Sequence, residues 1–270
     1  MKSGKGKKVV GGTWRHPAGY YSVNLGTNWE VNPVIFAEAS QGAGPSTIIR
    51  FVAETEGYKA QVQHYPSNGL PDEVLKRALA GPLMAAGLLF DWQVENLAGN
   101  KLYYAGVDIN GNTVVTAFIR HGDITFGIDV YNNWEMDLEK LKKLAETIAG
   151  SIHTRHKLGA DPTNGNSYLL GQWTADWGQY SQGLYVHNSF GVSKSWAFHP
   201  DGTLEYYEAT SFTFYGSGDY GGAENATRAV AFYRVLDDIL YIYADAVILA
   251  PFFFSDGKMQ LGIEQLVKVN

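Results

Sequence analysis

The stretch Leu170–Tyr207 begins with Leu-Gly-Gln-Trp and ends with Trp-Ala-Phe-His-Pro-Asp-Gly-Thr-Leu-Glu-Tyr-Tyr. A short apolar run, a Gly-x-Trp tripeptide, a polar segment and an aromatic strand on an Asp-Gly turn are typical of the first strands of an antiparallel barrel. From here to the end of the chain, strands are expected at Gly171–Tyr180, Tyr185–Phe190, Ser193–His199, Thr203–Phe214, Arg228–Leu236, Ile239–Tyr243, Val247–Phe254 and Met259–Val269. About eight strands joined by short turns favour an up-and-down barrel.

The sequence upstream of the barrel mixes strands with two helices. Thr13–Val31 predicts a hairpin, and alternation over residues 124–130 predicts a strand with one buried face. Further strands are expected at Ile48–Ala53, Tyr58–His64, Asp91–Leu97, Leu102–Ile109 and Thr113–Arg120. A helix is expected to start at Pro71 and to end or kink at Pro82. Asn133–Ile152 has the clearest helical period, with lysines on its outer face.

The expected fold class is therefore α+β, with an antiparallel sheet and flanking helices followed by an all-β up-and-down barrel. The α+β domain is expected over residues 13–153 and the barrel over residues 168–270. Residues 154–167 contain Gly, Asp-Pro and Asn-Gly-Asn without apolar periodicity, which predicts a linker.

Composition limits the function classes. Aromatic residues make up 14% of the 270 residues and charged residues only 18%, with a formal net charge of −6. Residues 156–270 hold twice as many acidic as basic residues, which argues against nucleic acid as a partner. The absence of cysteine excludes disulfides, thiolate chemistry and Cys-ligated metal.

Targeting signals leave the compartment open. The basic run Lys2–Lys8 is followed by an apolar segment too short for a secretory signal, and no stretch reaches the ~20 apolar residues of a membrane span. The protein is either cytoplasmic or has lost a signal or anchor segment. We expect the second case, with a periplasmic or extracellular location.

Two resemblances follow from short motifs. Arg15-His16-Pro17-x-Gly19-Tyr20, followed by Trp29 and by the expected order of elements, resembles the PsbP-like fold over residues 13–153. That resemblance implies a domain that binds other proteins and has no shared catalytic residues. Gly171-Gln172-Trp173 and Phe198-x-x-Asp201-Gly202-Thr203 resemble small lipocalin-like barrels, which implies a barrel that binds a ligand or a second partner.

Strand parity selects the candidate barrel residues. In Thr203–Phe214 the side chains of Leu204 and Tyr206 are expected to face the barrel interior. Glu208 lies an even number of residues away and is expected to face the same way. In the next strand Arg234 shares a face with Val230 and Leu236. An inward Arg234 is expected either to pair with Glu208 or to hold a ligand carboxylate, as in a fatty acid. The alternatives are a bulge that changes the face, or a position at the open barrel end where both side chains reach water.

Three tryptophans have the same ambiguity. Trp173, Trp177 and Trp196 are either the packed floor of the barrel or a platform for a ligand, and the first is the commoner use of such residues. The ligand-binding hypothesis therefore names Tyr206, Glu208, Arg234, Trp173 and Trp196.

Motifs for catalysis and for metal binding are missing. There is no Gly-x-Ser-x-Gly and no His-Glu-x-x-His, and opposite parity separates Glu205 from Glu208 as an acid–base pair. His153 and His156 are expected to cap a helix end rather than to hold a metal. We therefore expect neither cofactor nor metal.

Three functions stay open on the sequence. The first is a non-enzymatic binding protein with a protein partner on the first domain and a small apolar ligand or second partner in the barrel. The second is a structural or accessory subunit, held through aromatic faces such as Phe252–Phe254. The third is an enzyme with a hydrolase-like site at the barrel mouth, where Glu208 acts as acid or base beside Arg234.

Overall fold

A computed structural model describes the chain at residues 9–10, 12–16, 19–24, 30–38, 46–55, 58–93, 101–107, 112–132, 137–155, 157–182, 187–215, 220–262 and 264–269. Contacts within the chain divide it into two compact units. The first unit comprises residues 1–38, 45–160 and 245–247, and the second comprises residues 39–44, 161–244 and 248–270.

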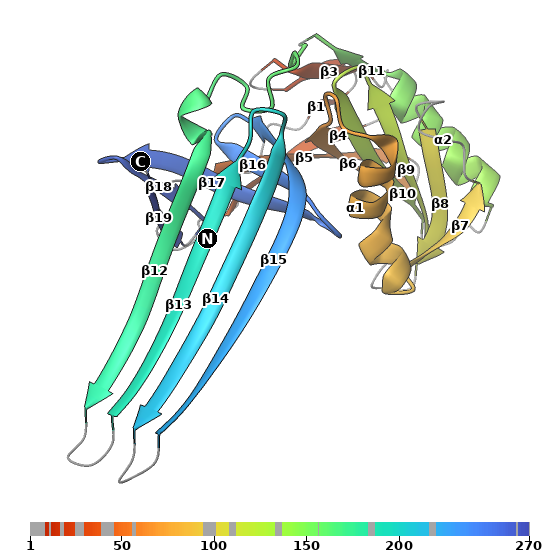
Figure 1. The fold of residues 1–270 in the computed structure, drawn as a ribbon. Helices are drawn as coiled ribbons and strands as arrows, with labels where there is room; N and C mark the ends of the chain where they lie inside the picture. Colours follow the sequence, from red (N-terminus) through yellow and green to blue (C-terminus); the bar gives the residue numbers. More distant parts are fainter. Residues whose placement is uncertain are drawn as a thin grey trace. The chain divides into compact units, whose positions relative to one another are not determined.

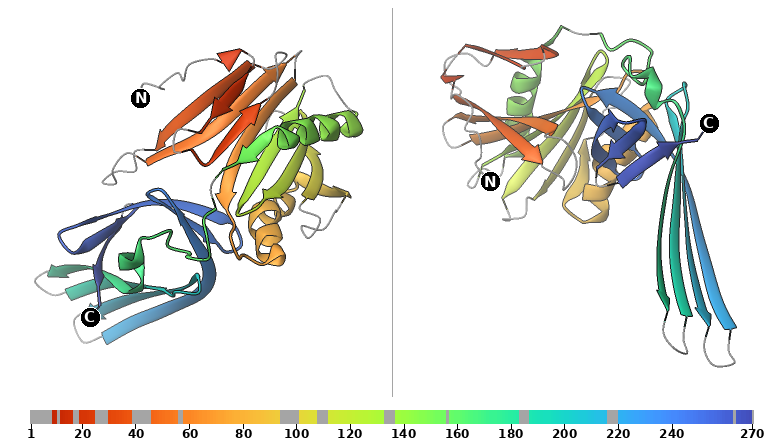
Figure 2. Two further views of the ribbon diagram at one scale, coloured as in Figure 1. Left: turned by 90° about the horizontal axis from the view of Figure 1, so that it is seen from above. Right: turned by 90° about the vertical axis from the view of Figure 1, so that its left-hand side faces the viewer.

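The first unit contains a large antiparallel sheet and a small one (Figures 1 and 2). The large sheet has the order β1-β4-β5-β6-β10-β9-β8-β7, and the small sheet has the order β11-β3-β2. The strands are β1 (Val9–Val10), β2 (Thr13–Arg15), β3 (Tyr21–Asn24), β4 (Glu30–Glu38), β5 (Ser46–Thr55), β6 (Tyr58–Pro66), β7 (Leu89–Gln93), β8 (Lys101–Val107), β9 (Thr113–His121), β10 (Ile124–Tyr131) and β11 (Ile152–Thr154).

Two helices contact side chains of opposite parity in the large sheet. Helix α1 (Asp72–Ala85) is joined to β9 by an ion pair of 3.0 Å between Asp72 and Arg120. Helix α2 (Leu138–Gly150) receives a hydrogen bond at Glu146 from the Tyr103 hydroxyl of β8. Tyr103 is paired with Ala117 of β9, which has the opposite parity to Arg120. The sheet is therefore covered on both faces.

The structure differs from two expectations in the first unit. Within the hairpin expected over Thr13–Val31, only β2 and β3 pair with each other, because β4 belongs to the large sheet and pairs with β1 and β5. The buried face expected for β10 is present, and Thr125 on its other face is fully buried as well. Its hydroxyl donates a hydrogen bond of 2.8 Å to Ser67, in the segment that leads into α1.

Helix α1 begins at the expected place and extends beyond the expected break. Pro71 is its N-cap, with Asp72 and Glu73 in the first turn. Pro82 lies inside the helix, which continues to Ala85. Trp29 and His156 lie outside the described residues.

The second unit is a closed barrel in which β12 to β19 follow one another in chain order and β19 closes on β12 (Figure 2). Its strands are β12 (Gly171–Gln182), β13 (His187–Phe198), β14 (Thr203–Tyr215), β15 (Tyr220–Leu236), β16 (Ile239–Tyr243), β17 (Val247–Ser255), β18 (Lys258–Leu261) and β19 (Glu264–Lys268). The short helix η2 (Ser167–Leu169) precedes β12. An eight-stranded barrel is thus present, as the sequence predicts.

Several strand boundaries differ from those expected, and the strand expected to begin at Arg228 begins at Tyr220. The predicted strands 185–190 and 193–199 are one strand, β13, because Gly191 stays extended and pairs with Ser211. The predicted strand 259–269 is two strands, β18 and β19, because the chain turns at Gly262, where φ is +58°. Glycine adopts this left-handed conformation without a Cβ clash.

The first four barrel strands are much longer than the last four. β15 has 17 residues and pairs with β16 only over Phe232–Leu236. β12 pairs with β19 only at Trp173 and Thr174. Beyond these points β12 to β15 continue as a four-stranded sheet with two open edges (Figure 1). We call this part of the second unit the extension.

The segment 154–167, expected as a linker, is ordered by contacts within both units. In the first unit Leu158 donates its N–H to Asp123, and the Asn68 side chain donates to the Gly159 carbonyl. In the second unit the Pro162 carbonyl accepts the N–H of Val235, and Thr163 is buried. The boundary between the units falls at residues 160 and 161.

Candidate functional site

An apolar cavity of about 460 Å³ lies in the second unit. Its apolar lining includes Trp196, Leu204, Ala231, Ile242, Ala250 and Leu261. These side chains come from six strands of the barrel, and the alanines of β15 and β17 leave the space that larger residues would fill. The cavity can therefore hold an apolar molecule of modest size.

The cavity has a small polar edge. Lys194 of β13 forms an ion pair with Glu264 of β19, and both residues line the cavity. The Tyr206 hydroxyl, which also belongs to the lining, donates a hydrogen bond to Glu208. In the strand register Lys194 lies directly opposite Glu208 on β14. Lys194, Tyr206, Glu208 and Glu264 therefore form one cluster, which we call the polar edge.

The surroundings of Tyr206 are apolar on one side and negative on the other. Its ring packs on Trp196 with centroids 4.5 Å apart. Burial, the hydrogen bond to Glu208 and the charges of Glu208 and Glu264 raise the pKa of Tyr206 above its ordinary value. Tyr206 therefore stays protonated at neutral pH and acts as a hydrogen-bond donor.

The structure brings Tyr206, Glu208 and Trp196 together but places Arg234 elsewhere. On β15 the residues that join the barrel core are Ala231, Tyr233 and Val235, so Arg234 faces out of the barrel. Glu208 pairs with Thr227 in the register, seven residues before Arg234. At ~3.3 Å per residue this separation is roughly 23 Å along the strand, so the expected Glu208–Arg234 pair does not form.

Arg234 lies buried on the outer side of β15. An added Cβ at Gly202 would overlap its guanidinium and would lie 3.1 Å from Pro162. Its guanidinium also donates to the Tyr233 carbonyl over 2.5 Å. Burial lowers the pKa of Arg234 from its ordinary value, and Arg234 has the role of a packed residue under the Asp-Gly turn.

Trp173 belongs to the packed floor of the barrel. Its side chain is fully buried, and its indole N–H donates 2.8 Å to the Leu169 carbonyl. Lys268 lies over its ring, 5.2 Å from the centroid. Trp173 does not line the cavity, whereas Trp196 does. The side chain of Trp177 lies outside the described part of the structure.

Parity along β14 separates Glu205 from Glu208, as the sequence predicts. Glu205 accepts a hydrogen bond of 2.7 Å from Arg228 on the outer side of the barrel, while Glu208 lies at the polar edge. A Glu205–Glu208 acid–base pair is therefore absent. An enzymatic site that combines Glu208 with Arg234 is absent as well, because the two side chains lie on opposite faces.

Sequence reasoning missed two residues of the polar edge, Lys194 and Glu264. The signal for Lys194 was local, since it shares its parity with Trp196 and Phe198 on one strand. Glu264 has no such signal, because only the turn at Gly262 starts a new strand there and brings it toward β13.

Two residues of the motif near the N-terminus, His16 and Tyr20, are buried in the first unit. The ring of His16 lies 5.1 Å from that of Tyr20 and 5.1 Å from that of His64. Burial and the nearby charge of His16 lower the pKa of His64 to about 3. Within the described residues, His64 Nδ1 and the Tyr21 hydroxyl have no hydrogen-bond partner. His64 is therefore neutral at physiological pH within this aromatic cluster.

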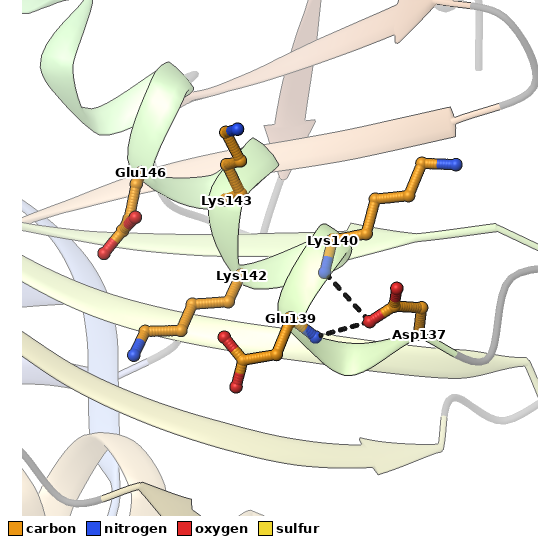
Figure 3. Close-up of a pocket in the computed structure, with 6 residues that line it drawn as sticks. All are labelled: Asp137, Glu139, Lys140, Lys142, Lys143 and Glu146. Carbon is orange, nitrogen blue, oxygen red and sulfur yellow. Dashed lines mark hydrogen bonds between the residues drawn. The ribbon is translucent and has the colours of Figure 1, made fainter.

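A second hollow, of about 500 Å³, lies over the outer face of α2 (Figure 3). Its lining consists of Asp137, Glu139, Lys140, Lys142, Lys143 and Glu146. The three lysines point in different directions, and Asp137 caps the helix by accepting the N–H groups of Glu139 and Lys140 (Figure 3). Equal numbers of opposite charges that do not converge are typical of a solvated helix face.

Among the residues that the structure describes, no group of three His, Asp or Glu side chains is placed to hold a metal ion. Neither α1 nor α2, the two α-helices in the described ranges, is long and apolar enough to cross a membrane.

Comparisons with known proteins give little further information. No family model matches the chain, and no curated protein matches it. A crystal structure from Bacteroides thetaiotaomicron VPI-5482 at 1.50 Å resolution aligns with a TM-score of 0.31 and 13% identity. The alignment covers 57% of this chain and 52% of that chain, so it spans about half of each.

Proposed function

We propose that the protein is a non-enzymatic binding protein whose barrel holds a small apolar ligand. The observation that supports this proposal is the cavity of about 460 Å³, whose lining is apolar apart from Lys194, Tyr206 and Glu264. A concave apolar pocket with a few polar groups at one side is the usual form of a small-molecule site.

The proposal extends to the family resemblances and to the first unit. The second unit is a lipocalin-like barrel, and the first unit is a PsbP-like domain that docks on a protein partner. Support comes from the eight-stranded barrel in chain order and from an antiparallel sheet with two helices. Docking by the first unit rests on fold-level analogy.

Blocking the cavity tests ligand binding. Ala231 of β15 lines the cavity, so Ala231→Phe is expected to fill part of it. Ala226→Phe places the same ring at an exposed position of opposite parity on the same strand and serves as the matched control. The measurement is the fluorescence of the neutral apolar dye N-phenyl-1-naphthylamine when titrated with the full chain.

We expect the dye to bind the wild type and Ala226→Phe alike, and to bind Ala231→Phe at least tenfold more weakly. Equal binding by all three chains, with Ala231→Phe folded by circular dichroism, would contradict the proposal. Native mass spectrometry of gently purified protein tests the same point for natural ligands and partners. Recovery of neither, together with turnover of a substrate, would favour the enzymatic alternative.

A further inference from the structure

The charges around the cavity define which apolar ligand it prefers. Three charged side chains belong to the polar edge: the cation Lys194 and the carboxylates Glu208 and Glu264. Lys194 is already paired with Glu264, so the two cancel. The second carboxylate, Glu208, accepts the hydroxyl of Tyr206 and faces Lys194 in the strand register. Counted as formal charges, one cation and two carboxylates leave the polar edge with one net negative charge.

The ion pair of Lys194 and Glu264 is partly buried, so water screens the charges of the polar edge less than it would in bulk solution. The side chains of Lys194 and Glu264 are 26% and 24% exposed. In such surroundings a charge interacts several times more strongly than in bulk water. Burial and the same two carboxylates, Glu208 and Glu264, raise the pKa of Tyr206.

The position of Arg234 removes the argument for a fatty acid. An inward Arg234 would have offered a cation to a ligand carboxylate, but it lies on the outer side of β15 under the Asp201-Gly202 turn. Among the lining residues the cation is Lys194, and its ammonium is already paired with Glu264. An anionic head group would meet a net negative edge and would have to displace Glu264.

We infer that the barrel cavity selects an apolar ligand with a cationic amino group, whose ammonium lies at Glu208 beside Tyr206 while its hydrocarbon part fills the space between Trp196, Ala231 and Leu261. This inference rests on the proposed function, because it assigns a ligand class to the same cavity. An ammonium group donates to the carboxylate oxygens that Tyr206 leaves free, and it brings the charge of the polar edge to zero.

Three competitors of equal length separate the charge of the head group from its hydrocarbon part. Decylamine, decanol and decanoate are titrated, below their micellar concentrations, into the full chain preloaded with N-phenyl-1-naphthylamine. We expect decylamine to displace the dye at a concentration at least tenfold below that of decanoate, with decanol between them.

A second experiment removes the carboxylate of Glu208. Glu208→Gln keeps the shape of the side chain and is expected to weaken decylamine about tenfold, the ratio produced by 1.4 kcal/mol, while decanol is unchanged. Glu205→Gln removes a carboxylate from the same strand on the outer side of the barrel and is expected to change neither.

The two levels of the proposal fail in different ways. If the dye binds and decanoate displaces it as well as decylamine does, the amine preference is wrong and the apolar site stands. If Glu208→Gln weakens decanol as much as decylamine, the carboxylate does not recognise the amine. If the dye does not bind the wild type, the proposed apolar site is itself wrong.

Discussion

At the scale of single residues, His64 is the most strongly perturbed titratable group outside the barrel. It is buried against His16, Tyr21 and Phe126 in the first unit, and its pKa is lowered from 6.5 to about 3. The unfolded chain takes up a proton on the imidazole near pH 6.5, whereas the folded chain does not until about pH 3. Acidification below pH 6.5 therefore favours unfolding, by about 1.4 kcal/mol per pH unit.

Replacement of His64 by Phe tests this dependence. The aromatic ring is kept and the titration is removed, so the loss in the free energy of unfolding between pH 7 and pH 5 is expected to shrink by about 2 kcal/mol. The measurement is urea unfolding at the two pH values. His153→Gln, at an exposed histidine, is the control and keeps the wild-type loss. An unchanged pH dependence in His64→Phe would show that another group is responsible.

Gly202 illustrates a second effect at the same scale. Its φ of +84° is strained for any residue with a Cβ, and an added Cβ would also overlap Arg234. Gly257, with φ of +75° and nothing within 4 Å of an added Cβ, has the strain without the overlap.

Alanine substitutions at the two glycines separate these costs. Gly257→Ala is expected to lower the free energy of unfolding by about 1 kcal/mol through backbone strain alone. Gly202→Ala is expected to lose about 3 kcal/mol, because the packed Arg234 must move as well. Chemical denaturation measures both. Equal losses would mean that Arg234 moves without cost.

At the scale of elements, the part of β15 that belongs to the extension is exposed. Residues 222–230 of β15 are exposed on both parities, whereas residues 233–236 are buried. Over this exposed part β15 pairs only with β14. Few apolar contacts and an open edge lower the free energy of local opening.

Hydrogen exchange tests this difference within one strand. Backbone amides of residues 222–230 are expected to exchange at least tenfold faster than those of residues 233–236. Peptide-resolved mass spectrometry on the full chain measures both segments in the same sample. Equal protection of the two segments would mean that something covers the extension in solution, such as a second copy of the chain.

At the scale of the whole molecule, the second unit has a core of its own. Every residue of the barrel's apolar core lies between Leu169 and Leu266, and the cavity is lined by residues of this unit. The η2 turn and the segment from Asp161 supply the contacts at Pro162 and Leu169. A chain that contains one complete core can fold by itself.

A fragment of residues 161–270 is therefore expected to fold and to bind N-phenyl-1-naphthylamine with the affinity of the full chain. Near-ultraviolet circular dichroism reports the packing of Trp173, and dye titration reports the cavity. A control fragment of residues 171–270 lacks the contacts at Pro162 and Leu169 and is expected to be less stable. A folded 161–270 fragment without dye binding would show that the cavity needs the first unit.

The order of the elements follows from local signals. The turn at Asp201-Gly202 and the alternation along β14 both depend on residues that are close together in the chain. In the turn, Asp201 accepts hydrogen bonds from Thr203, two positions away. The inward parity of Leu204, Tyr206 and Glu208 therefore follows from β14 alone. In the first unit, the sequence also places α1 and α2, but not the sheets to which β3 and β4 belong, since strand pairing joins distant segments.

The sequence by itself determined an eight-stranded barrel after an α+β region, and it selected five candidate barrel residues, of which the structure brings Tyr206, Glu208 and Trp196 together. Only the tertiary structure decided the face of Arg234, because β15 is apolar on both sides near its end and the turn at Gly202 covers its outer side. It also decided the partner of Lys194, since Glu264 reaches it only when the barrel closes. The alternation of side chains within a strand depends on neighbouring residues. The segment that covers the outer side of β15 and the strand that closes the barrel are both far away in the chain, and they determine which charged side chains line the cavity.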